Sequence, residues 1–199
     1  MGVSVLFVGV SGALSQMLRA EGGALTVQGT MMMILSLAVG AVLGELLDLE
    51  DRMERFGAWL KVKTKSESDG GFIGAFVTAS LTVCIGAMAI VGSIQDGILG
   101  DHATLFAKAV LDLVIIMVMT ASMGKGCIFS AIPVGILQGS VTLLARLLQP
   151  VFTDAALSNL SLVGSVLVFC VGLNLVWGKK IRVANLLPSL LIAVIWAFL

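Results

Sequence analysis

The amino-acid sequence predicts an all-α protein, a polytopic transmembrane helix bundle with about seven spans. Hydrophobic residues make up 58% of the chain and charged residues only 12%, whereas soluble domains are about half apolar and about a quarter charged. Long apolar stretches recur along the chain, and Lys and Arg gather in alternate connections between them. A soluble fold of this length has too little interior to cover these runs, so we expect the bilayer to cover them.

Seven stretches approach the length of about 20 residues that crosses the hydrocarbon core. Within a few residues at each end they are 2–18, 30–47, 71–94, 105–123, 128–148, 160–177 and 184–198. The first stretch has no basic region before it and no clear cleavage site after it, so we expect a retained helix rather than a removed signal. The stretches fill most of the chain, which predicts a single transmembrane domain over residues 1–199.

Residues 48–70 form the one long polar segment of the sequence. Within it, Met53, Phe56, Trp59 and Leu60 recur at helical spacing among charged residues, a pattern typical of an amphipathic helix. We therefore expect this connection to form a helix lying on the membrane surface.

The distribution of Lys and Arg predicts the orientation, because short translocated loops are poor in these residues. Nine of them fall in the second, fourth and sixth connections: Arg52, Arg55, Lys61, Lys63, Lys65, Lys125, Lys179, Lys180 and Arg182. The other connections, counted with the adjoining helix ends, hold only Arg19 and Arg146, and Lys108 falls inside a span. We expect a multi-pass protein of the bacterial cytoplasmic (inner) membrane, with the N-terminus and residues 48–70 in the cytoplasm and the C-terminus outside.

A glycine-centred signature occurs three times and predicts helix-hairpin internal repeats. It reads FVGVS at 7–11, CIGAM at 84–88 and CVGLN at 170–174. The alternative is a chance likeness, because small residues recur in membrane helices for packing. The glycines for which we predict a helix-packing role are Gly40, Gly44, Gly86, Gly135, Gly139 and Gly172.

Lys108 and Asp112 are the most informative polar residues, since both lie in the stretch 105–123 at a spacing that places them on one helix face. Two charges are expensive to bury in lipid, so we expect them to face the bundle interior or a water-filled path. The alternative is a structural ion pair near the outer end of the helix, with Lys108 reaching the interface.

The connection before this stretch holds Gln95, Asp96 and His102, with Gly97 and Gly100 predicting a tight turn. We interpret it as an anionic vestibule of the same path. Asn174 and Asn185, at the sixth and seventh stretches, are further candidates to line the path. The alternative for these amides is simple bonding between neighbouring helices.

Several function classes lack the residues that they require. One histidine with scattered aspartates is too few for a metal site, and we expect no cofactor. The three cysteines lie in apolar runs and are interpreted as small buried side chains. There is no phosphate-binding glycine loop and no catalytic triad, so we expect no enzyme. A net charge of zero makes nucleic acid an unexpected partner.

Long strings of the sequence resemble one known family. They are GTMMMILSLAVGAVLGELLDLEDRMERFG, GFIGAFVTASLTVCIGAMAIVGSIQDGILGDHATLFAKAVLD, FSAIP and VGLNLVWGKKIRVANLLPSLL. They are similar to the bacterial membrane proteins of domain-of-unknown-function family 554, the YdfK-like and YqgA-like group. The resemblance implies a multi-pass protein of the cytoplasmic membrane, often suspected of transport, with no substrate assigned. Members of that family usually begin with a further apolar helix, which we do not find before residue 1.

These observations favour a small secondary transporter or channel for an ion or small polar solute. Lys108, Asp112, Asn174, Asn185, Gln95 and Asp96 would line its path. The alternative is a membrane scaffold or regulatory subunit without transport activity. The small-residue helix faces also suggest a homo-oligomer, for which we expect a dimer.

Overall fold

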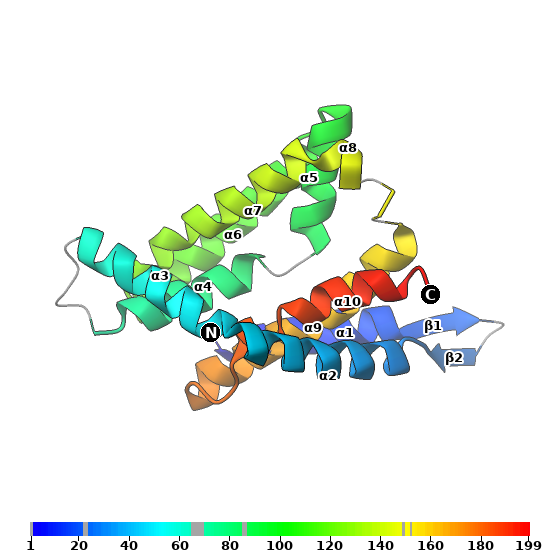
Figure 1. The fold of residues 1–199 in the computed structure, drawn as a ribbon, viewed down its shortest axis with the longest axis horizontal. Coiled ribbons are helices and arrows are strands. Elements are labelled where there is room, and N and C mark those ends of the chain that lie inside the picture. The colour runs from blue at the N-terminus through cyan, green and yellow to red at the C-terminus, as the bar shows by residue number, and fades with distance from the viewer. Residues whose placement is uncertain (1, 22–23, 65–69, 85–86, 149, 152) are drawn as a thin grey trace. The chain divides into compact units, whose positions relative to one another are not determined.

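A computed structural model describes residues 2–21, 24–64, 70–84, 87–148, 150–151 and 153–199 (Figure 1). The described residues are mainly helical, so the predicted all-α class is confirmed. Their contacts divide the chain into two compact units, Met1–Leu49 with Pro150–Leu199, and Glu50–Gln149. We refer to them as the terminal unit and the central unit.

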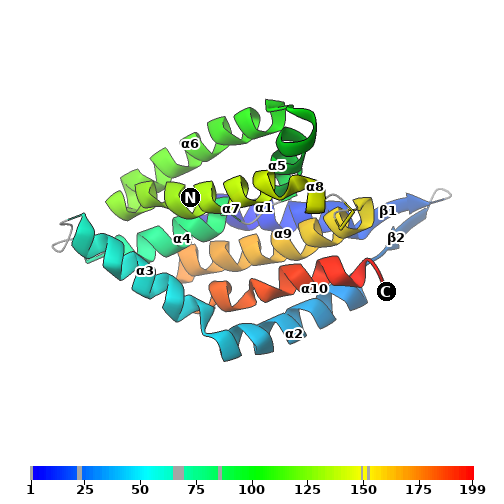
Figure 2. The ribbon, with the colours of Figure 1, turned by 45° about the horizontal axis from the view of Figure 1, so that its top comes forward.

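The terminal unit is a row of helices closed at one end by a short hairpin. Its elements are α1 (Gly2–Met17), β1 (Leu18–Glu21), β2 (Ala24–Val27), α2 (Thr30–Leu47), α9 (Asp154–Trp177), the 3₁₀ helix η2 (Val183–Leu186) and α10 (Pro188–Trp196). Figure 2 shows α1, α9, α10 and α2 side by side in that order, and each neighbouring pair is in contact. Met32, Leu162, Val163 and Ala193 form the buried core between α2, α9 and α10.

The antiparallel pair β1–β2 departs from the sequence prediction, which has only a connection there. Leu18 pairs with Val27 and Glu21 with Ala24. The sequence between the strands is Gly22–Gly23, and a Gly-Gly dipeptide between two short runs is a recognised hairpin signal. The hairpin turns the chain back, so α2 runs antiparallel to α1 (Figure 2).

Helices α1 and α9 pack antiparallel through glycines. A Cβ atom built on Gly9 would lie 2.5 Å from the backbone nitrogen of Phe169, and one built on Gly172 would lie 2.8 Å from that of Leu6. Gly9 and Gly172 are the same position of the repeated signature, and Leu6 and Phe169 each precede it by three residues. The two contacts are therefore equivalent, as a two-fold axis between the helices would make them.

The ends of the same interface obey the same relation. A Cβ on Gly2 would lie 3.0 Å from the Cβ of Leu175, and one on Gly12 would lie 3.2 Å from the Cβ of Ser165. In the alignment of Gly9 with Gly172, Gly2 corresponds to Ser165 and Gly12 to Leu175. The repeat signature therefore coincides with a pseudo-two-fold relation between α1 and α9.

Helices α2 and α10 form the second antiparallel pair of this unit. A Cβ on Gly40 would lie 2.5 Å from the backbone of Ser189, and one on Gly44 would collide with the backbone carbonyl of Asn185. Because α2 lies beyond α10 and not beside α1, the pseudo-two-fold relation applies to the pair α1 and α9 and does not extend to α2 and α10.

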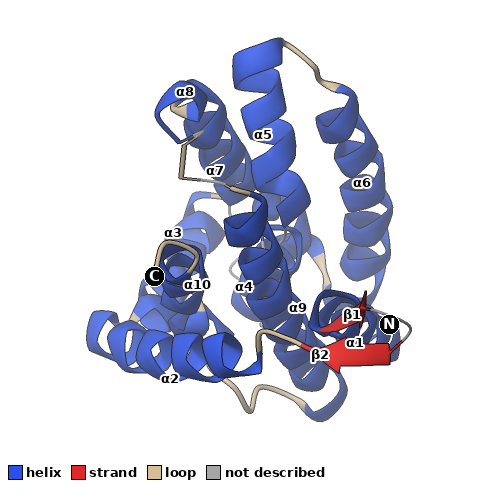
Figure 3. Ribbon diagram, turned by 90° about the vertical axis from the view of Figure 1, so that its right-hand side faces the viewer, coloured by secondary structure: helices blue, strands red, loops and turns tan. Residues whose placement is uncertain are grey.

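The central unit consists of helices arranged around α4 and α5. Its elements are α3 (Leu49–Lys63), α4 (Phe72–Cys84), α5 (Ala87–Leu99), α6 (Ala103–Met123), the 3₁₀ helix η1 (Lys125–Ser130), α7 (Ala131–Leu143) and α8 (Ala145–Leu148). Helix α4 contacts α6, η1 and α7, and α5 contacts α6, α7 and α8. Figure 3 shows α5 beside α6 and α7. Ala75, Ala79, Met119 and Cys127 form its buried core.

Among the described residues, four helices are long and apolar enough to cross a bilayer: Thr30–Leu47, Ala103–Met123, Lys125–Leu143 and Asp154–Trp177. The other predicted stretches coincide with the shorter apolar helices Gly2–Met17, Phe72–Cys84 and Val183–Trp196. Helix α3 occupies most of the predicted amphipathic connection 48–70, of which 65–69 lie outside the described residues.

The predicted stretch 71–94 contains α4 and the first part of α5, and residues 85–86 between them lie outside the described residues. Helix α4 ends at Cys84, α5 begins at Ala87, and α5 continues to Leu99. The predicted turn at Gly97 is absent because this glycine lies inside α5, where a Cβ would come within 2.5 Å of the Cβ of Ala145. The helix ends instead before Gly100, whose φ is 67°, a conformation that glycine adopts without strain.

Candidate functional site

Lys108 lies buried in the central unit and is bonded to two acceptors. Its side chain forms an ion pair with Asp112, one helical turn further along α6. Its Nζ also donates a hydrogen bond of 3.0 Å to the backbone carbonyl of Val83. Only 6% of Lys108 is exposed, so its charge depends on these partners rather than on water.

The contact with Val83 explains why a cation is stable at this position. Val83 is the last residue but one of α4, and the final carbonyls of a helix lack partners within the helix. These carbonyls carry partial negative charge, which favours a cation at a helix C-terminus. Lys108 therefore completes the end of α4 while Asp112 balances its charge. The Asp112 side chain remains 22% exposed, which makes it the accessible side of the pair.

The residues predicted to form a vestibule lie in α5 and just before α6, and the vestibule itself stays a prediction. Thr104 donates a hydrogen bond of 2.7 Å to Gln95, and His102 contacts the carboxylate of Asp96. Thr104, Lys108 and Asp112 follow one another at four-residue spacing, so they share one face of α6. This face is polar in the first half of α6 and apolar further along the helix, where Met119 is buried.

Ser93 is a buried residue of α5 that the sequence interpretation did not single out. Its hydroxyl is fully buried, and among the described residues it has no hydrogen-bond partner. Buried hydroxyls are normally bonded to protein or to ordered water. The sequence offered one indication of this residue, since Ser93 lies within one helical turn of the candidate residues Gln95 and Asp96.

In the terminal unit, Asn174 holds the loop between α9 and η2. Its Oδ1 accepts hydrogen bonds of 2.9 Å from the backbone N–H groups of Lys180 and Ile181. Its Nδ2 donates one of 2.6 Å to the carbonyl of Ile181. The chain leaves α9 through Gly178, whose φ of 80° is strained for other residues. A single amide therefore determines the path of this loop.

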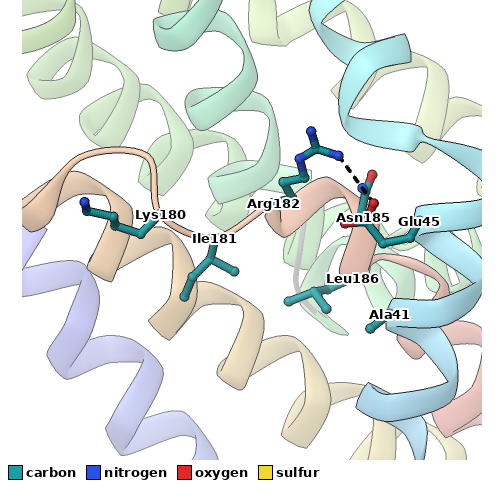
Figure 4. Close-up of a pocket in the computed structure, with 7 residues that line it drawn as sticks. All are labelled: Ala41, Glu45, Lys180, Ile181, Arg182, Asn185 and Leu186. Carbon is teal, nitrogen blue, oxygen red and sulfur yellow. Dashed lines mark hydrogen bonds and ion pairs between the residues drawn. The ribbon is translucent and has the colours of Figure 1, made fainter.

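The loop borders an open cavity of about 420 Å³, shown in Figure 4. Its lining residues are Ala41, Glu45, Lys180, Ile181, Arg182, Asn185 and Leu186. Asn185 is buried in η2. Arg182 pairs with Glu45 at 3.3 Å and with Asp48 at 3.9 Å.

Asp48 owes its position to the end of α2. It adopts a left-handed conformation, with φ 48°, and its N–H donates to the carbonyl of Glu45. Aspartate tolerates this conformation better than most residues. From the sequence, Glu45 could be placed only at the end of a helix, and Arg182 only in a basic loop. Their pairing depends on the packing of α2 against α10.

The predicted path residues thus form two separate groups. Lys108, Asp112, Gln95 and Asp96 lie in the central unit, and Asn174 and Asn185 lie beside the loop of the terminal unit. That all of them line one path stays a prediction. Among the described residues, no three His, Cys, Asp or Glu side chains converge as a metal site requires.

The glycines with a predicted packing role behave differently from one another. Gly40, Gly44 and Gly172 lie against the backbone of a neighbouring helix. Gly86 lies outside the described residues. At Gly135 and Gly139 a Cβ would meet no described atom within 4 Å, because this face of α7 points away from the helices that α7 contacts. A packing role for these two stays a prediction.

Comparison with known proteins agrees with this helical architecture. The chain is 32% identical over 159 residues to "Uncharacterized membrane protein YdfK" of Bacillus subtilis (strain 168), covering 80% of this chain and 66% of that protein. It is 30% identical over 165 residues to "Uncharacterized protein YqgA" of Escherichia coli (strain K12), covering 81% of this chain and 70% of that protein. The chain thus spans about two thirds of the length of these relatives.

No solved structure matches the chain. The model of the family described as "Protein of unknown function (DUF554)" matches residues 1–198, nearly the entire sequence. Together with the long apolar helices and the membrane-protein relative, this match shows that the chain is a multi-pass membrane protein and belongs to the DUF554 family.

Proposed function

We propose that the protein is a secondary transporter or channel for an ion or small polar solute. The observation that carries this proposal is the buried pair Lys108–Asp112 inside an apolar helix. A lysine in a membrane span is costly and is retained mainly where it faces a path for ions or solutes. A purely structural cap for α4 needs no ionised residue, since a neutral donor would serve.

The geometry of the pair suggests how it takes part in transport. Asp112 is the more accessible member, so a proton or a cation reaches its carboxylate first. Once Asp112 is neutralised, the ammonium of Lys108 loses one of its two partners. It is then available to an anionic group of the solute while it remains bonded to Val83.

The pseudo-two-fold contact between α1 and α9 supports the same function. Transporters of several kinds are built from repeats with opposite orientation, whose relative rocking opens a path to each side in turn. The equivalent contacts at Gly9 and Gly172 give α1 and α9 the symmetric interface that such a movement uses.

The setting of the protein belongs to the proposal. We place it in the bacterial cytoplasmic membrane with the N-terminus and α3 on the cytoplasmic side, following the distribution of Lys and Arg. Phe56, Trp59 and Val62 are exposed on α3, and the ammonium of Lys63 lies 5.3 Å from the centre of the Trp59 ring. This combination suits a helix on a membrane surface. We further propose a homo-oligomer and no enzymatic activity.

The test is flux through proteoliposomes that contain the full chain. We would screen inorganic ions, amino acids and small organic acids by thermal shift, since a ligand at 100 times its Kd stabilises the folded state by about 2.7 kcal/mol. Uptake of each hit would then be measured. We expect Lys108→Met with Asp112→Leu to abolish uptake while the protein remains folded.

The matched control is the exposed pair Asp51–Arg55 on α3, which has the same four-residue spacing. Changing both of its members to apolar residues should leave uptake unchanged. If the Lys108–Asp112 double variant is folded and transports at the wild-type rate, the proposal fails. A folded wild-type protein without any ligand or flux would favour the alternative, a membrane scaffold or regulatory subunit.

A further inference from the structure

The cavity beside the loop of residues 178–182 contains opposite charges at close range. Arg182 and Glu45 form its ion pair, and their side chains are 59% and 56% exposed. Exposed ion pairs contribute little stability, typically about 0–1 kcal/mol. A ligand that offers its own cation and anion therefore replaces this pair at small cost.

Arg182 has donors to spare for an anion. Both of its contacts, to Glu45 and to Asp48, are made by Nη1. Among the residues that the structure describes, no acceptor is seen for its Nη2 or Nε. These two groups form the fork that binds phosphate or carboxylate in a bidentate manner.

The carboxylates provide the complementary half of the site. Glu45 and Asp48 lie on the same side of Arg182 and share its single Nη1. Together they carry more negative charge than Arg182 neutralises. A primary ammonium, with three N–H donors, satisfies both carboxylates once Arg182 turns to an anion.

Hydrogen bonds and a close backbone contact fix the two segments that carry the site. Asn174 binds the backbone of Lys180 and Ile181 through three hydrogen bonds. On the other side, Gly44 brings α2 against the backbone of Asn185. The backbone positions of Glu45 and Arg182 are thus largely set before a ligand arrives, which reduces the entropy lost on binding.

The location of the site distinguishes a lipid from a free solute. Glu45 and Asp48 lie at the C-terminal end of α2, a helix long enough to span a bilayer, and so at the level of lipid headgroups. Ala41, Ile181 and Leu186 give the cavity an apolar side. Val42 and Leu46 of α2 are 62% and 78% exposed and offer a surface for acyl chains.

From these observations we infer that the cavity binds the headgroup of a phospholipid that carries a primary ammonium and a phosphate, as phosphatidylethanolamine does. The ammonium lies against Glu45 and Asp48, and the phosphate binds Nη2 and Nε of Arg182. This binding is independent of the proposed transport, so each can fail without the other.

The test is native mass spectrometry of the full chain in detergent, with three lipids of identical acyl chains. Phosphatidylethanolamine should bind about tenfold more tightly than phosphatidylcholine, whose ammonium has no N–H donor, a ratio equivalent to about 1.4 kcal/mol. It should also bind more tightly than phosphatidylglycerol, which has no ammonium. Equal binding of the three lipids would overturn the inference.

Variants assign the preference to this cavity. Glu45→Gln should remove most of it. Arg182→Met should instead weaken the binding of all three lipids, because each of them carries the phosphate. Arg182→Lys should weaken this binding less, because lysine keeps the charge and loses the fork. The control Asp51→Asn, in an exposed ion pair of α3, should bind the lipids as the wild type does. A preference that survives Glu45→Gln, or an unchanged affinity for all three lipids in Arg182→Met, contradicts the assignment.

A soluble competitor tests the choice of a lipid. Glycerophosphoethanolamine carries the same phosphodiester and primary ammonium without acyl chains and should displace the lipid only at far higher concentration. If it binds as tightly as phosphatidylethanolamine, the ligand is a free zwitterion and the assignment to a lipid is wrong.

Discussion

Gly9 of α1 and Gly172 of α9 occupy equivalent positions on either side of the point where these two helices cross. Each brings its own helix against the backbone of the other, at Phe169 and at Leu6. The three-residue offset from glycine to contact is the same in both directions. A repeat that is visible in the sequence is therefore also a symmetry of the packing.

This symmetry predicts that Gly9→Ala and Gly172→Ala have similar effects. In each variant the new methyl group meets backbone, which cannot move aside as a flexible side chain does, so we expect each to destabilise the protein by about 1–3 kcal/mol. The double variant should lose less than the sum, because both changes separate the same interface. Thermal unfolding in detergent measures all three, and a neutral Gly9→Ala beside a destabilised Gly172→Ala would contradict the relation.

Gly44→Ala should be the most damaging glycine substitution in the terminal unit. Its methyl group would collide with the backbone carbonyl of Asn185, so α2 and α10 must separate. We expect a lower unfolding temperature and a smaller folded fraction in size-exclusion chromatography.

The matched control is Gly139→Ala on α7, where a Cβ meets no described atom within 4 Å. This change should be neutral or stabilise the helix by up to about 1 kcal/mol, because alanine has the higher helix propensity. A large loss at Gly139 would instead show that this face of α7 is packed against a partner, which the predicted oligomer would provide.

Removing one member of the Lys108–Asp112 pair should cost more than removing both. Asp112→Leu leaves the buried ammonium of Lys108 without its counter-charge, and breaking a buried pair in this way typically costs about 3–5 kcal/mol. Lys108→Met with Asp112→Leu removes the charge as well, so we expect that double variant to be more stable than Asp112→Leu alone. A double-mutant cycle from thermal unfolding measures the coupling, and additive effects would mean that the two charges do not interact.

Asn174→Ala should free the loop that borders the cavity. Three hydrogen bonds are lost, each contributing about 0.5–1.5 kcal/mol. Hydrogen exchange at the amides of Lys180 and Ile181 should accelerate at least several-fold. Asn174→Asp keeps the acceptor and should lie between the wild type and Asn174→Ala.

Asn159 provides the control for this experiment, since it lies on the same helix and donates to the carbonyl of Ala193 elsewhere in the terminal unit. Asn159→Ala should leave exchange at Lys180 and Ile181 unchanged. Equal acceleration in both variants would mean that α9 as a whole, and not the bonds of Asn174, protects the loop.

The sequence by itself determined the features of this protein that depend on neighbours along the chain. Apolar length predicted the helices and the membrane class, because hydrocarbon thickness sets the number of apolar residues that a span needs. The pairing of Lys108 with Asp112 was also predictable, since residues four apart on a helix are neighbours whatever the rest of the fold does. The hairpin β1–β2 also had a local signal in Gly22–Gly23, although the sequence analysis treated that segment only as a connection.

Only the tertiary structure decided which helices meet and what their ends contact. That Lys108 completes the end of α4 at Val83, that Arg182 reaches Glu45, and that Gly9 faces Phe169 all involve residues distant in the sequence. The equal glycine spacing at Gly40–Gly44 and at Gly135–Gly139 makes the same point. The first pair packs against α10 and η2, whereas a Cβ on either glycine of the second pair would meet no described atom within 4 Å. Spacing on a helix specifies a face, but the partner of that face follows from the packing of the other helices, which local sequence does not encode.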